Sequence, residues 1–125
     1  MFDIDLRSRT PIYEQLYKRV VELTVKNQLA AGDKLPSVRE LAKELGVNPN
    51  TVSKAFGELE RDGIIYSVPG RGSFIAEQNG GIIKKNAEDS FERAVKEAAT
   101  AGLLKPDMLR VIDRFFDTEG KENEK

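Results

Sequence analysis

The residue types that most often perform covalent or metal-assisted catalysis are missing from this sequence. None of the 125 residues is histidine or cysteine, so the chain cannot pair a nucleophile with an imidazole base, and it lacks the usual nitrogen and sulfur ligands of zinc. The 21 acidic residues are interspersed with 20 basic ones at helical spacings, which is typical of solvated helix faces. We therefore expect no enzyme activity, no metal site and no cofactor.

Short hydrogen-bonding side chains gather instead on one predicted helix, which begins after residue 48 and ends before Gly63. Its apolar side carries Val52, Ala55, Phe56 and Leu59. Its free side carries Asn50, Thr51, Ser53, Lys54 and Gly57. Asparagine can bond adenine at two points, serine and threonine can bond bases or phosphates, and lysine can bond guanine or phosphate. These residues fit the major groove of DNA, although an ordinary solvated helix face has a similar composition.

The preceding residues predict two further helices. Thr10 as N-cap and Pro11 in the first turn predict a helix over residues 11–28 with Gly32 as its end, and the Ser37–Glu40 capping box predicts a short helix over 38–45. Only residues 46–48 separate this helix from the next, which Asn48 caps. Two helices joined by a three-residue turn with glycine form a helix-turn-helix.

The segment that follows the third helix predicts a β-hairpin. In "IIYSVPGRGSFI", residues 64–75, two β-branched and aromatic runs flank a Pro-Gly-Arg-Gly tip. Helices followed by a hairpin describe a winged helix-turn-helix, so the predicted fold is mainly α with a small β-hairpin. We expect this domain to span residues 1–76.

The composition changes after the hairpin. Residues 77–86 contain a Gly pair and turn-forming polar side chains, which predict a linker. Asn86 as N-cap opens a predicted helix that ends at Gly102, and Pro106 opens a second one. We expect a two-helix segment over 87–118 and a disordered tail over 119–125.

The stretch "LPSVRELAKELGVNPNTVSKAFGELERDGIIYSVPGRGSFI" resembles the DNA-binding domain of GntR-family transcription regulators, and the short two-helix end resembles the YtrA subfamily. The resemblance implies that Arg39 and Thr51 contact phosphate, that Asn48, Asn50 and Ser53 face DNA, and that Gly70 and Arg71 enter the minor groove. The full set of expected DNA-binding residues is Ser37, Arg39, Asn48, Asn50, Thr51, Ser53, Lys54, Gly70, Arg71 and Gly72. Many family members have arginine where this chain has Pro49 and Ser53, so we expect a different operator sequence.

The charge of the predicted DNA-binding region is almost balanced. Between Lys34 and Ile75 there are six basic and five acidic residues, a net charge of 6 − 5 = +1. Because neutralised phosphates supply much of the affinity for DNA, one such domain should bind weakly. Two linked domains would bind more strongly, since the second contact becomes intramolecular.

The C-terminal helices carry more apolar surface than a solvated pair needs. They either pack on the winged helix of the same chain or pair with a second chain, and the resemblance favours a homodimer. The expected dimer-interface residues are Phe91, Val95, Ala98, Leu104, Leu109, Ile112, Phe115 and Phe116.

The residues and the resemblance together predict a cytoplasmic, dimeric repressor that binds a pseudo-palindromic operator in double-stranded DNA. The alternative is a protein-interaction module that uses a winged helix without binding DNA. The sequence identifies no small-molecule effector, predicts no membrane partner, and contains no apolar run near the roughly 20 residues that span a bilayer.

Overall fold

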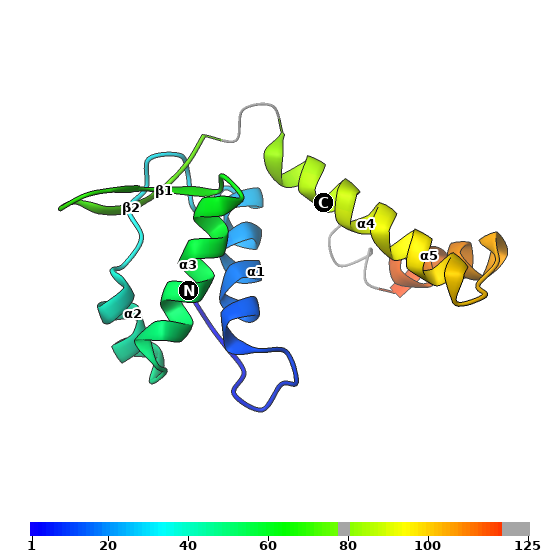
Figure 1. Cartoon of the computed structure of the whole chain (residues 1–125), viewed down its shortest axis with the longest axis horizontal. Coiled ribbons are helices and arrows are strands. Elements are labelled where there is room, and N and C mark those ends of the chain that lie inside the picture. The colour runs from blue at the N-terminus through cyan, green and yellow to red at the C-terminus, as the bar shows by residue number, and fades with distance from the viewer. Residues whose placement is uncertain (78–80, 119–125) are drawn as a thin grey trace. The chain divides into compact units, whose positions relative to one another are not determined.

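A computed structural model describes residues 1–77 and 81–118, so the predicted tail over 119–125 lies outside the described residues. The chain divides into two compact units, Met1–Ile83 and Lys84–Lys125, which are described separately below. Figure 1 shows the chain with its elements labelled.

The first unit is built around its third helix. It contains α1 (Ile12–Val25), α2 (Val38–Leu45), α3 (Pro49–Arg61), β1 (Ile65–Val68) and β2 (Gly72–Ile75). Helix α3 packs against α1, α2 and β1, and the tip of the hairpin and α2 lie on the same side of α3, with α1 on the other (Figure 1). This arrangement is a winged helix, and it confirms the predicted fold class.

The short N-terminal caps of α2 and α3 form as the sequence predicts. The Ser37 hydroxyl accepts a 3.0 Å hydrogen bond from the Glu40 backbone N–H, and the Glu40 carboxylate accepts a 3.0 Å bond from the Ser37 N–H. The Asn48 side chain accepts a 2.8 Å bond from the Asn50 N–H, with Pro49 as the first residue of α3. Each helix therefore begins at the predicted residue.

Both predicted ends of α1 are wrong. Pro11, not Thr10, is the N-cap residue, and no side chain caps the helix there. The Gln15 amide instead donates to the backbone oxygens of Asp5 and Thr10 and ties down the N-terminal arm. The helix ends at Val25 rather than residue 28, because Asn27 takes a left-handed backbone conformation with φ of 61°.

The hairpin forms the wing of the fold. Its strands are antiparallel, with Tyr66 opposite Phe74 and Ser67 opposite Ser73. The Arg71 N–H donates to the Val68 carbonyl across a turn with proline second and Gly70, at φ of 77°, third, as in a type II turn. The sequence gives no sign of a third extended segment, yet Lys34 forms a β-bridge with Phe74.

One hydrophobic core holds the first unit together. It includes the buried side of α3 and residues from the N-terminal arm and the loop before α2. Its members are Phe2, Leu16, Val20, Leu23, Leu29, Leu35, Leu41, Ala42, Val52, Ala55, Phe56, Leu59, Ile64, Ile65 and Ile75. The predicted apolar side of α3 is thus confirmed residue by residue.

Helix α4 (Ile82–Thr100) begins five residues earlier than the predicted start at residue 87. Asn86 therefore lies inside the helix and is not its cap. The cause is packing, since Ile83 lies against the core of the first unit. A Cβ added at Gly63 would lie 3.4 Å from the Ile82 Cδ1, so Ile82 also lies close to the turn after α3.

The second unit consists of most of α4 and of α5 (Lys105–Thr118). The connection between them bends at Gly102, and the Asp107 carboxylate accepts a 2.8 Å bond from the Leu104 N–H at the start of α5. None of the described residues of these two helices is buried.

A hydrogen bond between α1 and the end of α3 adds to the core. The Tyr17 hydroxyl donates to the Asp62 carboxylate at 2.5 Å. Burial, together with this bond and the negative charge of Asp62, raises the pKa of Tyr17 above its ordinary value. The neutral phenol is therefore the form that the folded state favours.

Replacing Tyr17 with Phe should lower the free energy of unfolding by about 1.5 kcal/mol, the low end for bonds to charged groups, because Asp62 is still partly exposed. The raised pKa means that Tyr17 stabilises the fold at neutral pH and that this contribution is lost as the pH rises above about 10. Urea unfolding at pH 7 measures the loss. The matched control is Tyr13→Phe, because the Tyr13 hydroxyl has no hydrogen bond within the described residues and should be dispensable for stability.

Candidate nucleic-acid interface

The free side of α3 is set by the packing of its other side. Asn50, Lys54, Gly57 and Arg61 are spaced by four, three and four residues, so they share the side of the helix opposite the buried residues. Ser53 is exposed on the flank of this side, and Thr51 is half-buried on the other flank. A Cβ at Gly57 would have no neighbour within 4 Å, so this turn of the helix is open to a close approach.

Two of the predicted DNA-binding residues have structural roles. The Ser37 hydroxyl and the Asn48 amide oxygen both accept backbone N–H groups at the starts of α2 and α3. Bonds from Ser37 lower the pKa of the Glu40 carboxyl that completes the cap. These two side chains fix the helix N-termini, and their remaining hydrogen-bonding capacity faces outward because both residues are exposed.

The charges around α3 differ from those on the outer side of α1. Lys18 on α1 and Lys26, the residue that follows α1, are each paired with a glutamate four residues away. In contrast, Arg39 in α2 and Arg71 in the wing are exposed and form no ion pair within residues 1–77 and 81–118. The positive charges that the sequence assigned to DNA are therefore not neutralised by neighbours.

Lys54 has an unexpected partner. Its ammonium nitrogen lies 3.9 Å from the centre of the Tyr13 ring, at the start of α1. Tyr13 and Lys54 are 41 residues apart in the sequence, which gave no indication of this contact. A cation above an aromatic face is a favourable arrangement that leaves the charge of the lysine intact.

The wing tip depends on its glycines and on the loop before α2. A Cβ at Gly72, where φ is 117°, would lie 3.0 Å from the Lys34 Cε, so the lysine stem packs directly on the glycine. Gly70 supplies the positive φ of the turn, and Arg71 between them is exposed. The predicted wing residues Gly70, Arg71 and Gly72 thus lie together at the tip of the hairpin.

A series of hydrogen-bonded side chains, which the sequence analysis did not predict, joins the wing to α3. The Ser67 hydroxyl donates to the Glu60 carboxylate at 3.1 Å and lies 3.3 Å from the Ser73 hydroxyl. Ser67 and Ser73 are opposite each other in the hairpin register. The two serines alternate along their strands with Tyr66 and Phe74, whose ring centres lie 5.6 Å apart on the other face of the hairpin. This alternation is the sequence pattern that could have predicted the contact between the serines.

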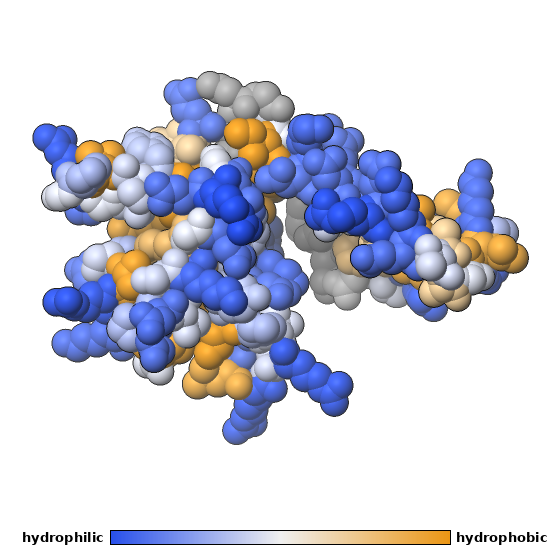
Figure 2. Space-filling view, in the orientation of Figure 1, coloured by the Kyte–Doolittle hydropathy of each residue, from blue (hydrophilic) through white to orange (hydrophobic). Residues whose placement is uncertain are grey.

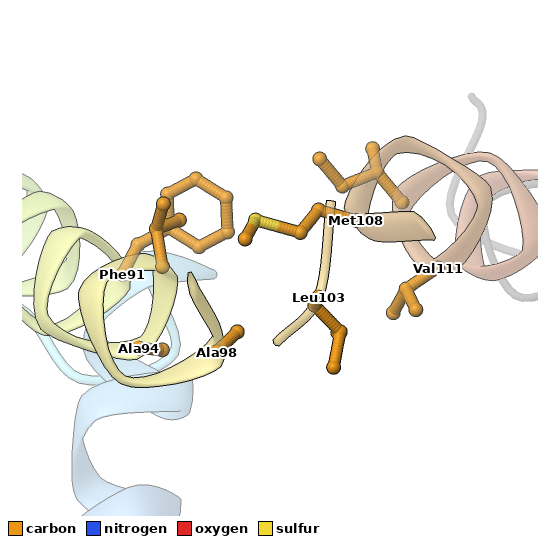
Figure 3. Close-up of a pocket in the computed structure, with 8 residues that line it drawn as sticks. Phe91, Ala94, Ala98, Leu103, Met108 and Val111 are labelled. Atoms are coloured by element: carbon orange, nitrogen blue, oxygen red, sulfur yellow. The ribbon is translucent and has the colours of Figure 1, made fainter. Parts of the chain in front are cut away.

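The predicted dimer-interface residues divide into two groups. Figure 3 shows an apolar groove of about 170 Å³ in the second unit, in which Phe91 and Met108 point toward each other. Its lining includes four predicted residues, Phe91, Val95, Ala98 and Ile112. The other four do not line it, and all of them are strongly exposed: Leu104, Leu109, Phe115 and Phe116. Figure 2 shows apolar residues at the surface of these helices.

The described residues give no indication of a metal site or of a membrane span. Within the described residues there is no group of three or more side chains that could hold a metal ion. The same part of the chain contains no helix that is long and apolar enough to cross a membrane.

Comparison with known proteins decides the family. Residues 12–75, from the start of α1 to the end of β2, match the family model described as "Bacterial regulatory proteins, gntR family". The chain belongs to the GntR family. GntR proteins are regulators rather than enzymes, which agrees with the missing catalytic residue types.

Two GntR relatives in Bacillus subtilis (strain 168) are similar in sequence. The transcriptional repressor YtrA is 58% identical over 77 residues, which cover 62% of this chain and 59% of YtrA. The uncharacterised regulator YhcF is 40% identical over 121 residues, which cover 94% of this chain and 98% of YhcF. The similarity to YhcF therefore includes the C-terminal helices, whereas the alignment with YtrA spans less than two thirds of that protein.

Solved structures share the fold. A transcriptional antiterminator from Listeria monocytogenes EGD-e is 36% identical with a TM-score of 0.69, and the match covers 92% of this chain and 89% of that one. YtrA from Sulfolobus acidocaldarius, a GntR-family transcription factor, is 40% identical with a TM-score of 0.62, over 76% of this chain and 97% of that one. The DNA-binding domain of AraR in complex with operator ORE1 is 30% identical with a TM-score of 0.52, over 59% and 90% of the two chains.

Replacing Ser37 with Ala should lower the free energy of unfolding by about 1 kcal/mol at pH 7, because the N–H groups at the start of α2 lose their cap. Glu40→Gln should also destabilise at pH 7, since the lowered pKa of Glu40 means that its carboxylate stabilises the fold above its ordinary pKa, and the effect should fade as the pH falls through the lowered pKa. Urea unfolding at pH 7 and at a series of lower pH values tests this. An unchanged stability of Ser37→Ala would show that the cap does not hold α2.

Proposed function

We propose that this protein is a dimeric repressor that binds a pseudo-palindromic operator through α3 and the wing. The observation that carries the proposal is the free side of α3, where short polar side chains and a lysine without a carboxylate partner among the described residues lie opposite a buried face. The operator complex of the similar AraR domain supports DNA as the partner. The winged helix offers no observation that favours the alternative, a protein-interaction module.

The proposed DNA contacts fall into three groups: base edges in the major groove, phosphates, and the minor groove. Asn50 and Ser53 lie near the start of α3 and are exposed, so they read base edges in the major groove. Arg39 and Thr51 bind phosphates, and the positive end of the α3 helix dipole adds to this attraction. Arg71 at the wing tip enters the minor groove, where a narrow groove attracts a guanidinium group.

Affinity is the reason for proposing a dimer. The net charge of +1 between Lys34 and Ile75 gives a single domain few phosphates to neutralise. Two domains held together convert the second contact into an intramolecular one, and this raises affinity without adding any contact. A two-fold pair of winged helices also matches a pseudo-palindrome, with half-sites about 34–36 Å apart or a multiple of that distance.

The second unit is the proposed site of pairing. None of the described side chains of α4 and α5 is buried, while Phe91, Leu104 and Phe116 are 57%, 68% and 63% exposed. Exposed apolar surface of this extent is typical of a surface that a partner covers. We propose the two-helix segment of residues 87–118 as the dimerisation segment, and a second copy of the chain as its occupant.

The remaining parts of the proposal follow from this role. A repressor of a bacterial operon acts in the cytoplasm, where the chromosome is. The identity of an effector is no part of the proposal, because none of the described residues indicates its chemistry.

Selection of bound sequences from a random duplex DNA pool tests the proposal. We expect enrichment of a pseudo-palindrome whose half-site spacing corresponds to one or more turns of DNA. A random RNA pool, treated in parallel, should give no enrichment and serves as the control. Enrichment of RNA but not of DNA, or of neither, would contradict the proposal.

Two single substitutions separate phosphate contacts from base contacts. Arg39→Ala should weaken binding to every duplex alike and lower the salt slope by about 0.9, as one lost phosphate contact predicts. Asn50→Ala should cost on the order of 1–3 kcal/mol on the selected operator and relax the preference at one position of each half-site. Fluorescence anisotropy with operator and scrambled duplexes measures both. The assignment of Asn50 fails if its loss is equal on the two duplexes.

Two further variants test the pairing surface. Phe91→Asp places a charge in the groove, whereas Phe115→Asp places one outside it, and the two phenylalanines are similarly exposed at 57% and 50%. Both should shift the protein toward monomers in sedimentation equilibrium, because a desolvated, unpaired carboxylate opposes burial of the interface. Removal of residues 87–125 should give a folded monomer that keeps Ile83 and its core contact. Variants that all remain dimeric would assign pairing to another surface.

A further inference from the structure

The contact between Lys54 and Tyr13 links the free side of α3 to α1. The ammonium nitrogen lies 3.9 Å from the ring centre. Tyr13 is half-buried and packs against the core, so its ring is held in place, whereas Lys54 is exposed. A fixed ring beneath a flexible lysine restricts where the ammonium group lies in the free protein.

A carboxylate partner offsets the charge of a basic side chain, whereas an aromatic ring does not. Arg19 on α1 and Arg61 on α3 are each within 4 Å of a carboxylate, which offsets their charge. Lys54 forms no ion pair among the described residues, and the uncharged Tyr13 ring orients its ammonium group without neutralising it. The lysine is therefore positioned by a partner that carries no opposite charge.

The direction of the Lys54 side chain indicates what it contacts. Lys54 shares the free side of α3 with Asn50 and Gly57. Its ammonium group, however, lies over the Tyr13 ring of α1 and not over the surface of α3. Asn50 and the side-chain-free turn at Gly57 are left clear for base edges. A cation displaced to the flank of a recognition helix lies nearer the phosphates that border the major groove than the bases on its floor.

We propose that Tyr13 is a positioning residue that holds Lys54 for a DNA phosphate, so that Lys54 adds affinity and no sequence preference. The inference rests on the proposed DNA-binding function and adds a residue of α1 to it. The sequence placed Lys54 on the free side of the predicted helix without choosing between guanine and phosphate, and it assigned no role to Tyr13.

A double-mutant cycle on operator affinity tests the inference in the full-length protein. Lys54→Ala should weaken binding to operator and scrambled duplexes by the same factor and lower the salt slope by about 0.9. Tyr13→Leu should weaken binding about 2- to 5-fold, the fold-change that corresponds to an exposed cation–π contact. Tyr13→Leu should have no further effect once Lys54 is alanine, and Tyr13→Phe, which keeps the ring, should match the wild type.

A measurement without DNA checks the contact itself. In the free protein, ring current from Tyr13 should shift the Lys54 ε-methylene protons upfield in NMR spectra of the wild type and of Tyr13→Phe. The shift should disappear in Tyr13→Leu, and thermal unfolding should confirm that each variant is folded. An unshifted lysine in the wild type would overturn the inference.

The outcomes separate this inference from the proposed function. Additive losses from Tyr13→Leu and Lys54→Ala, or a loss on Lys54→Ala confined to one operator base pair, would overturn the role of Tyr13 while DNA binding stands. A wild-type protein that binds no duplex would overturn the proposed function, and with it the inference.

Discussion

The burial of one side of α3 is the constraint on which the rest of the structure depends. Val52, Ala55 and Leu59 are completely buried, and contacts of α3 with α1, α2 and β1 hold the helix from three directions. A helix fixed in this way has one free side, and its residues need no packing function. Because α3 is held in this way, its short polar side chains and the open turn at Gly57 face outward near the wing.

Electrostatics is the reason for proposing that two copies of this surface act together. The winged helix has almost no net charge, and its useful cations are the few that lack a carboxylate partner among the described residues. Arg39, Arg71 and Lys54 are three of these: Arg39 is exposed on α2, Arg71 is exposed at the wing tip, and Lys54 lies over the Tyr13 ring. A small number of well-placed charges should give a single domain modest affinity, and the unburied helices of the second unit are the proposed means of pairing.

The parts of the fold that local chemistry determines could be predicted from the sequence. The Ser37 cap, the Asn48 cap and the buried side of α3 depend on residues within one or two turns of each other. The errors arise where distant residues decide: Gln15 rather than Thr10 ties the start of α1 to the arm, and Ile83 extends α4 by packing on the core. The Lys54–Tyr13 contact and the Glu60–Ser67 bond also join separate elements, so the sequence offers candidate residues but does not show how they are held.

Amide chemical-shift mapping with a selected operator half-site tests the central claim most directly, because it reports every residue of the winged helix at once. The account predicts that the largest changes lie in the first turns of α3, at the start of α2 and at Gly70–Gly72, with the outer face of α1 around Lys18 and Lys26 unchanged. Largest changes on that outer face of α1, with the free side of α3 unaffected, would contradict it.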